Sequence, residues 1–447
     1  MKKFLYKQLM NTDANFEVLR YTKQVIYKKK GSGMRVKLRF LLIGLAAALA
    51  LAGCGAPDNS QNETPAQTAA ASRTPEAVVP STDEPSATAA AETPGQTAQT
   101  GAVTVTAVNV GYGDAILIQL GGQNFLIDTG ASKASDKLLC ALAASGVKKL
   151  DGVFLTHTHG DHIGGLEASA QRYDIGALYA ADISLDPDKI DKLAEKLGLS
   201  LQRLSAGNTV TTDSGAVFEV LGPLVLNGDD DNDNSLVLRL KAGGLVWLFT
   251  GDMQFAEENS LMNANADIKA DVLKVGNHGN PDATSDDFAK KVAPETAVIS
   301  TSTEEDEDSA NPRVKSALDG ADIYVTQDYT LGVAIKAESD KLSAEDLKPE
   351  PANASVKISI DKKEQRATLT SDADTDISGW FIWSEKGGKL FVFPEGATIK
   401  ANVPLVVACK GGSGDYIWDK KKVWKDKADE AGVLYTSGGA KAARSGY

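Results

Sequence analysis

The chain is poor in cysteine, in histidine and in positive charge, and each scarcity narrows the classes of protein it can be. Three cysteines in 447 residues are too few for an exported scaffold built on disulfides. The apolar run Leu41 to Leu51 is too short for a typical membrane span. The net charge of −13 gives an acidic surface that repels polyanions, so any affinity for nucleic acid must come from metal ions or from a local basic patch.

The N-terminal region has the pattern of an export signal. A basic stretch from Met34 precedes the apolar run, which ends in Leu51-Ala-Gly-Cys54. This resembles a bacterial lipoprotein signal, with Cys54 as the lipidated first residue of the mature protein. The resemblance implies anchoring through the Cys54 lipid at the extracellular face of the cell membrane. An uncleaved signal anchor is the alternative. Residues 1–33 precede a second plausible start at Met34, so we interpret them as the product of an upstream start codon or as a cytoplasmic tail.

Composition divides the rest of the chain into a tether and two domains. Residues 55–101 are mostly Ala, Thr, Pro, Gln, Ser and Glu and cannot bury enough apolar surface to fold, so we expect a disordered tether. The roughly 350 residues that follow are too many for one typical core. We predict a first domain over 102–340, a linker over 341–352 and a second domain over 353–447.

Strand and helix patterns alternate in the first domain. Three β-rich runs come first, namely Val103–Val110, Ala115–Leu120 and Asn124–Asp128. A helical segment over Ala134–Ser145 makes Cys140 most simply a buried helical thiol. The short apolar strand Val153–Leu155 then leads directly into His157. In α/β folds, the crevice at the carboxyl ends of strands is where sites are built.

All four histidines fall within two short motifs. Thr156-His-Thr-His-Gly-Asp-His162 holds three of them, and Lys274-Val-Gly-Asn-His-Gly279 holds the fourth. A further apolar strand ends in a carboxylate, in Leu245-Val-Trp-Leu-Phe-Thr-Gly-Asp252. Imidazole is the commonest ligand of zinc-like cations, and carboxylates complete such shells. With histidine so rare in this chain, the placement favours a metallo-hydrolase over a chance surface pair.

The spacing suggests two cation sites. In a loop at the end of a strand, His157 and His159 can face one cation, while Asp161 and His162 lie further along and can face a second. Asp252, at the end of its own strand, is placed to bridge them. Two cations a few ångström apart lower the pKa of a bridging water and supply hydroxide at neutral pH, and they neutralise charge that develops on a phosphoryl or carbonyl oxygen.

Residues 102–340 resemble a metallo-β-lactamase-fold hydrolase, in particular the ComEC-type competence family. The matching stretches are Val110–Ile118, Leu126–Gly130, Thr156–Gly165, Asn234–Arg239, Phe249–Asp252, Val272–Gly279 and Ala297–Ser300. The resemblance implies an α/β fold, a four-layer αβ/βα sandwich with its site at one edge. It also implies cleavage of phosphodiesters, including extracellular DNA, by a nuclease or phosphodiesterase.

The same resemblance assigns roles to individual residues. His157 and His159 bind one metal ion, and Asp252 bridges it to a second ion whose other ligands are Asp161, His162 and His278. The expected cofactor is two divalent ions, zinc or manganese, with Asp161 and Asp252 as the catalytic residues. The residues expected to orient the ligands are Asp114, Asp128 and Asn234.

Three positions depart from the family pattern. No histidine lies between His162 and His278, and the acidic run Asp229–Asn234 occupies this region instead. We interpret that run as a solvated loop rather than a set of ligands. Asn277 replaces the first residue of a His-His-Gly pair, and Asn311-Pro312 lacks a histidine common in that loop. These departures leave two alternatives, a catalytically impaired metal-containing binding protein and a hydrolase of small esters or lactones.

The second domain has the pattern of an all-β sandwich. Its expected strands are Val356–Ile360, Ala367–Thr370, Gly379–Trp383, Leu390–Pro394 and Pro404–Ala408. Ile377–Trp380, Phe393–Gly396 and Val423–Asp429 resemble a lamin-tail-type immunoglobulin-like domain. Its 15 basic against 12 acidic residues contrast with the acidic remainder. The segment Trp418–Trp424 can contact bases or wall polymers, but we favour its tryptophans as core residues.

Overall fold

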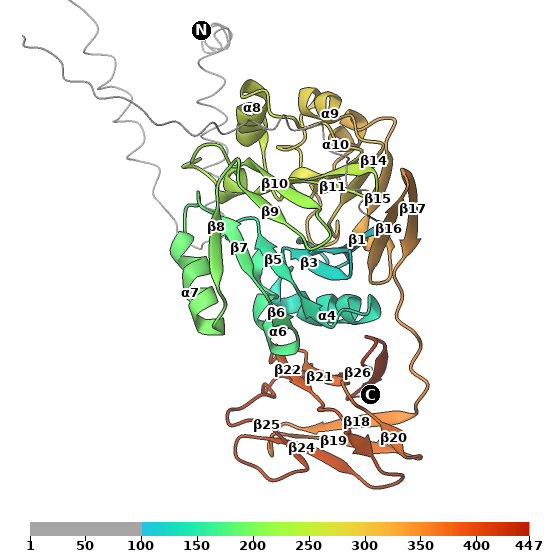
Figure 1. The fold of residues 1–447 in the computed structure, drawn as a ribbon. Helices are drawn as coiled ribbons and strands as arrows, with labels where there is room; N and C mark the ends of the chain where they lie inside the picture. Colours follow the sequence, from blue (N-terminus) through green and yellow to red (C-terminus); the bar gives the residue numbers. More distant parts are fainter. Residues whose placement is uncertain (1–100, 447) are drawn as a thin grey trace, which may run out of the picture. The chain divides into compact units, whose positions relative to one another are not determined.

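The computed structural model describes residues 101–446, which belong to one compact unit spanning residues 91–447 (Figure 1). The predicted signal, Cys54 and nearly all of the predicted tether lie outside the described residues. Within the described part of the chain, no helix combines the length and the apolar character needed to cross a bilayer.

The first domain contains two large mixed sheets. The eight-stranded sheet has, in spatial order, β17 (Lys341–Asp346), β16 (Gly332–Glu338), β1 (Val103–Val108), β2 (Ile116–Leu120), β3 (Gln123–Ile127), β5 (Gly152–Leu155), β7 (Leu178–Ala181) and β8 (Leu201–Leu204). The seven-stranded sheet has β15 (Asp322–Val325), β14 (Thr296–Ile299), β13 (Val272–Lys274), β12 (Leu245–Phe249), β11 (Val237–Ala242), β10 (Val217–Gly222) and β9 (Thr209–Thr211). The short strands β4 (Lys149–Leu150) and β6 (Asp174–Ile175) pair separately.

Helices cover the outer faces of these sheets. They are α4 (Ser135–Ala144), α5 (Gly160–Ile163), α6 (Leu166–Arg172), α7 (Pro187–Leu197), α8 (Phe255–Asn263), α9 (Asp286–Val292) and α10 (Pro312–Ala317). Residues 101–446 also contain short turns of 3-10 helix, namely η1 (Ser132–Ala134), η2 (Asp231–Asn234), η3 (Gly276–Gly279) and η4 (Thr326–Asp328). The expected helix over 134–145 is therefore confirmed as α4, and Cys140 is a buried free thiol on it.

Strand alternation explains the layers. On β2, Ile116 and Ile118 face the core between the two sheets, whereas Leu117 faces the core under α4 and α6. The inter-sheet core joins Phe154 of the first sheet to Trp247 of the second. A third core lies between the second sheet and helices α8, α9 and α10. These layers confirm the predicted four-layer αβ/βα sandwich.

The C-terminal domain is a sandwich of two small sheets, as expected. One sheet has β18 (Val356–Asp361), β19 (Arg366–Ser371), β24 (Leu405–Cys409) and β25 (Tyr416–Asp419). The other has β22 (Lys389–Val392), β21 (Phe381–Ser384), β26 (Gly432–Tyr435) and β27 (Lys441–Arg444), and β20 (Thr375–Asp376) pairs with β23 (Thr398–Ile399). Trp424 is fully buried and lies edge-on to Trp418, which confirms its interpretation as a core residue.

Two features of the domain boundary differ from the prediction. Lys341–Asp346, placed in the linker, pairs with β16 as strand β17, because residues 341–346 continue the first sheet after a two-residue turn. One face of β21 packs inside the sandwich, and the opposite face packs against the first domain. Phe381 lies under the guanidinium of Arg172 at 4.2 Å, and the Tyr435 hydroxyl donates to Asp136 at 2.8 Å. The sandwich therefore shares a core with α4 and α6.

Candidate metal centre

The histidine motif lies at the carboxyl end of β5, where the sequence placed it. β5 runs parallel to β3 and β7 and ends at Leu155, so the chain turns into the site directly after a buried strand. α5 begins at Gly160 and carries Asp161 and His162. A Cβ at Gly165 would overlap the carbonyl oxygen of Thr129, so glycine is required for this close backbone approach.

Four side chains converge beneath this loop. Their ligand-type atoms, from Asp161, His162, Asp252 and His278, lie within 4.8 Å of one another. Asp252 is central, since its Oδ2 lies 2.9 Å from His162 Nε2 and 3.0 Å from His278 Nε2. His278 Nε2 also lies 3.4 Å from Asp161 Oδ2. We call this set the inner cluster.

The backbone at the second motif is bent to deliver His278. After β13 the chain enters η3, where Asn277 and His278 both have positive φ, at 41° and 53°. Such left-handed geometry is uncommon outside glycine and clusters at functional sites. His278 Nδ1 donates to the carbonyl oxygen of Ser300 at 2.8 Å, and the Tyr112 ring lies 4.2 Å from the imidazole. These contacts leave Nε2 facing Asp252.

The remaining nitrogen of His162 is held by Asp128. His162 Nδ1 lies 2.8 Å from Asp128 Oδ2, and the same carboxylate accepts from the Thr156 backbone N–H and hydroxyl at 2.8 and 2.7 Å. A carboxylate in this position fixes the ring and raises its basicity as a ligand. The structure therefore places Asp128 where the sequence predicted an orienting group.

The inner cluster holds opposite charges together. Burial opposes the charged forms, but Asp252 and Asp128 outweigh it and hold the pKa of His162 well above its usual value. His278 is affected in the same way by Asp252, and its pKa rises to about 9. Asp252 is likewise buried, yet His162 and His278 hold its pKa well below the ordinary range. Asp252 is therefore an anion that is available as a ligand.

His157 and His159 lie beside the cluster rather than inside it, and we call this pair the outer half. His157 Nε2 is 4.0 Å from Asp252 Oδ2. Burial lowers the pKa of His157 well below its usual value, so the ring is neutral. His159 is 44% exposed in its side chain, and the nearest carboxylate oxygen is Oδ1 of Asp230 at 4.0 Å. The structure thus brings His157 to Asp252 but leaves His159 at the rim.

Sequence reasoning missed Lys274, which ends β13. Its ammonium group is buried, pairs with Asp114, donates to the Gly251 carbonyl oxygen at 2.8 Å and lies 3.6 Å from Asp252 Oδ1. Burial disfavours this charge, but Asp114 and Asp252 outweigh it and raise the pKa. A single lysine at the end of an apolar strand has no sequence pattern that predicts this role. Asp114 reaches His278 as well, 3.6 Å from Nδ1.

The acidic run is not a solvated loop. Asp231–Asn234 form η2 and are buried, because their side chains cap backbone N–H groups of neighbouring segments. Asp231 accepts from Thr158, and Asp233 accepts from Gln254 and Glu257. Asn234 accepts from the Asn227 backbone N–H and donates to the Asp230 carbonyl oxygen and to Asp231, so its hydrogen bonds stay within this loop. The role of Asn234 in orienting a ligand therefore stays a prediction.

The two asparagine replacements have local roles. The Asn277 amide donates to Asp282 Oδ1 at 2.9 Å, and its oxygen lies 3.5 Å from Asn232 Nδ2, so the side chain points out of the cluster. Asn311 is the N-cap of α10 and accepts from the Arg313 backbone N–H at 2.9 Å. Among the described residues, both asparagine side chains bond to nearby loop and helix-cap groups.

The residues present fit a divalent metal. Among the described side chains, His157 Nε2, His278 Nε2 and Asp252 Oδ1 are buried without a hydrogen-bond partner. Buried polar atoms without partners are costly, and a cation between the two imidazole nitrogens, which lie 4.0 and 3.0 Å from Asp252 Oδ2, would satisfy them. Imidazole and carboxylate together suit zinc or manganese.

Known proteins are similar in sequence to the region that carries the metal centre. Residues 108–303 match the model of the metallo-beta-lactamase superfamily. ComE operon protein 3 of Bacillus subtilis is 31% identical over 214 residues, which cover 43% of this chain and 27% of that protein. Competence protein ComA of Neisseria gonorrhoeae is 33% identical over 198 residues, covering 44% of this chain and 26% of that protein. The chain thus spans about a quarter of the length of these relatives.

A solved structure is also similar. The metallo-beta-lactamase fold protein YhfI from Bacillus subtilis matches 53% of this chain and 100% of its own, at 16% identity and a TM-score of 0.39. The family match, by contrast, covers the strands and loops that carry His157, Asp252 and His278. The region that matches the metallo-beta-lactamase superfamily, residues 108–303, thus contains a cluster of His and Asp residues able to bind metal.

Proposed function

We propose that this protein is an exported, lipid-anchored, metal-dependent phosphodiesterase whose substrate is extracellular DNA. The observation that carries the hydrolase proposal is the inner cluster, in which Asp252 meets His162 and His278 at 2.9 and 3.0 Å. Cations held there and by the outer half would activate water and neutralise charge on a phosphoryl oxygen.

The protein groups around the cluster have distinct roles in this proposal. Asp161 is the most open carboxylate of the cluster, with 24% of its side chain exposed. Partial burial opposes its charge, but His278 and His162 outweigh this and lower the pKa of Asp161 to about 2. It is thus ionised and reachable by water, and it orients the attacking water. Asp128 and the Ser300 carbonyl hold His162 and His278 from behind. Tyr112 covers His278 and limits solvent on that side.

The substrate proposal rests on likeness to competence proteins rather than to antibiotic-resistance enzymes. Two relatives are named for competence, ComE operon protein 3 and ComA. We extend that association to this chain as a phosphodiester substrate. Export and anchoring rest on the pattern around Cys54, and the lamin-tail-like character of the C-terminal sandwich rests on its sequence motifs.

The test is a metal-dependent assay of the purified full chain. Bis-p-nitrophenyl phosphate and a labelled single-stranded oligonucleotide are each supplied with manganese or zinc, with Asp252→Ala as the inactive control. We expect hydrolysis that requires metal and stops with chelator. If the protein binds metal yet turns over neither substrate faster than the control, it is a metal-containing binding protein. Hydrolysis of a lactone alone would instead establish the small-ester alternative.

A further inference from the structure

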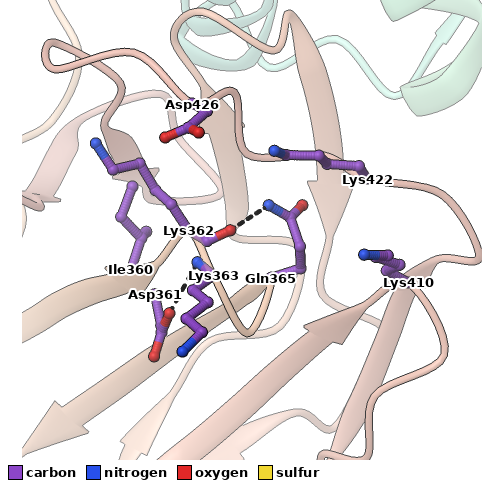
Figure 2. A pocket seen from close by; sticks show the side chains of 8 residues that line it. All are labelled: Ile360, Asp361, Lys362, Lys363, Gln365, Lys410, Lys422 and Asp426. Atoms are coloured by element: carbon purple, nitrogen blue, oxygen red, sulfur yellow. Dashed lines mark hydrogen bonds between the residues drawn. The ribbon is translucent and has the colours of Figure 1, made fainter.

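A lysine-lined pocket lies in the C-terminal sandwich, far along the chain from the metal centre. Its volume is about 630 Å³ (Figure 2). The lining residues are Ile360, Asp361, Lys362, Lys363, Gln365, Lys410, Lys422 and Asp426. Three separate segments supply the lysines, namely the β18–β19 hairpin, the end of β24 and the loop after β25. The pocket therefore has two more positive than negative side chains in an otherwise acidic protein.

Three of the four lysines in this pocket form no ion pair within the described part of the chain. In the described part of the chain, no carboxylate lies within ion-pair distance of the ammonium groups of Lys363, Lys410 or Lys422, and all three side chains are exposed. Lys362 donates only to the carbonyl oxygen of Lys427, at 2.7 Å. By contrast, Lys386 and Lys400 of the same domain pair with aspartates. Repulsion among like charges makes such a grouping costly unless an anion is bound.

A buried glutamine holds the three segments together. Gln365 is 1% exposed, and its amide donates to the carbonyl oxygens of Lys362 and Trp424 at 2.6 and 2.9 Å. Its side-chain oxygen accepts from the backbone N–H groups of Val423 and Trp424. Its own carbonyl accepts from Cys409 N–H at 2.9 Å. Figure 2 shows Gln365 between Lys362 on one side and Lys410 and Lys422 on the other.

This arrangement presents the lysines in a fixed relation before any ligand arrives. The glutamine satisfies its own donors and acceptors, so it needs no ligand to be stable. Lys363, Lys410 and Lys422 each follow an ordered segment, and their side chains are exposed to solvent. A preorganised set of charges binds an extended anion with less ordering cost than lysines on separate loops.

We infer that this pocket binds the phosphodiester backbone of nucleic acid and holds long substrate for the metal centre. Ammonium groups are point charges that suit phosphate. The lining contains no aromatic side chain, and Trp424 is fully buried, so bases are not stacked and sequence is not read. The inference rests on the proposed phosphodiesterase function for the identity of the polymer.

A flat membrane surface fits these features less well. The lysines surround a concave pocket rather than a face, and the apolar side chain that a lipid interface would bury is limited to Ile360. A linear chain of phosphates can enter such a pocket and reach charges on opposite walls. Anionic vesicles therefore become an outcome of the test rather than a second proposal.

The test compares two triple variants of the full chain with equal net charge. The pocket variant is Lys363→Gln, Lys410→Gln and Lys422→Gln. The control variant is Lys357→Gln, Lys389→Gln and Lys441→Gln, three lysines on β18, β22 and β27 that do not line the pocket. Binding of fluorescein-labelled dT20 is followed by anisotropy from low to physiological salt, and the length of the oligonucleotide is checked on a gel afterwards.

We expect the pocket variant to bind dT20 about tenfold more weakly at low salt, with the slope of log K against log salt reduced by about 2, because three phosphate contacts are lost at about 0.7 each. The control variant should retain the wild-type slope. A labelled dC20 should behave as dT20 does. Circular dichroism checks folding, and if the triple variant is unfolded, single Lys410→Gln and Lys422→Gln variants should each lower the slope by about 0.7.

Three results would overturn the inference. They are an unchanged slope in the pocket variant, an equal loss in both variants, and a loss of binding to phosphatidylglycerol vesicles with dT20 binding intact. Turnover of bis-p-nitrophenyl phosphate separates this inference from the proposed function. If both triple variants and the wild type fail to hydrolyse it while the pocket variant still loses dT20 binding, the phosphodiesterase proposal fails and the pocket remains.

Discussion

The inner cluster and the outer half of the metal centre are built differently. In the inner cluster, His162 and His278 each have their second ring nitrogen fixed, one by Asp128 and one by the Ser300 carbonyl. In the outer half, His157 has the hydroxyls of Thr156 and Ser235 at 3.0 and 3.3 Å from Nδ1, and His159 is at the rim. The inner cluster is thus held from behind on both histidines, whereas the outer half combines the buried His157 with the exposed His159.

This difference predicts the affinity of each half for a metal ion. Ligands that are already held in place lose little conformational freedom on binding metal, whereas an exposed histidine must be ordered. The open half is also the side from which substrate can approach, since catalytic metal sites keep a position free of protein ligands. We therefore expect a tight ion in the inner cluster and a weaker one at the outer half.

The largest effect is expected for Asp252→Ala, which breaks both halves at once. Asp252 contacts His162 and His278 directly and faces His157 at 4.0 Å. Its loss should remove both ions and lower phosphodiester hydrolysis by more than about 100-fold, as measured by metal analysis and initial rates. The matched control is Asp230→Ala at the rim, which should keep most of the activity. Wild-type rates in Asp252→Ala would show that the bridging role is wrong.

The next test compares the metal affinities of two variants, His278→Ala in the inner cluster and His159→Ala in the outer half. The buried ligand should be needed for the tight ion, so His278→Ala should lose the high-affinity phase in a calorimetric metal titration. His159→Ala should retain that phase and weaken only the second, by about tenfold. If His159→Ala abolished the tight phase and His278→Ala did not, the two halves would have the opposite order of affinity.

A smaller effect is expected from the support of the inner cluster. Asp128→Asn keeps the shape of the side chain but removes the charge that orients His162, so the affinity for the tight ion should fall by about 10- to 100-fold. The second ion should be affected less. Asp282→Asn is the control, because Asp282 bonds Asn277 outside the cluster. Equal losses of affinity in the two variants would argue against a specific role for Asp128.

The smallest effect concerns a buried carboxylate that has no cation beside it. Glu257 is 1% exposed, and burial raises its pKa from 4.5 to about 7, the opposite of the shift at Asp252. The folded state therefore holds a proton that the unfolded state releases, so stability falls as pH rises from about 4.5 through 7. Glu257→Gln keeps an acceptor for the Leu224 N–H and should stabilise the protein by ~2 kcal/mol at pH 8.

That stabilisation should shrink toward pH 5, where wild-type Glu257 is protonated in the folded state. Thermal melts at both pH values measure the difference. A variant that is equally stable relative to wild type at pH 5 and pH 8 would show that Glu257 does not titrate in this range.

Sequence patterns predicted the parts of the fold that depend on local spacing. Apolar runs located β2, β3 and β5, and the short strand before His157 located the site at a strand end. Rare histidines beside carboxylates identified the ligand set, because few other roles require that pattern. Asp128 was predicted from a motif to orient a ligand, and in the structure its Oδ2 lies 2.8 Å from His162 Nδ1.

What the sequence did not predict depends on contacts between distant segments. The run Asp229–Asn234 has the composition of a solvated loop, yet Asp231–Asn234 are buried, because Asp231 and Asp233 accept from distant backbone N–H groups such as those of Thr158, Leu185 and Gln254. Lys274 is paired with Asp114 across 160 positions, which no local pattern reveals. The packing of Phe381 and Trp383 against the first domain was missed for the same reason.

The central claim is that Asp161, His162, Asp252 and His278 hold a metal ion, and a native mass spectrum of the full chain titrated with zinc or manganese tests it most directly. We predict one ion bound at stoichiometric metal and a second only at excess. A protein that remains folded and binds no ion at any concentration would contradict the account.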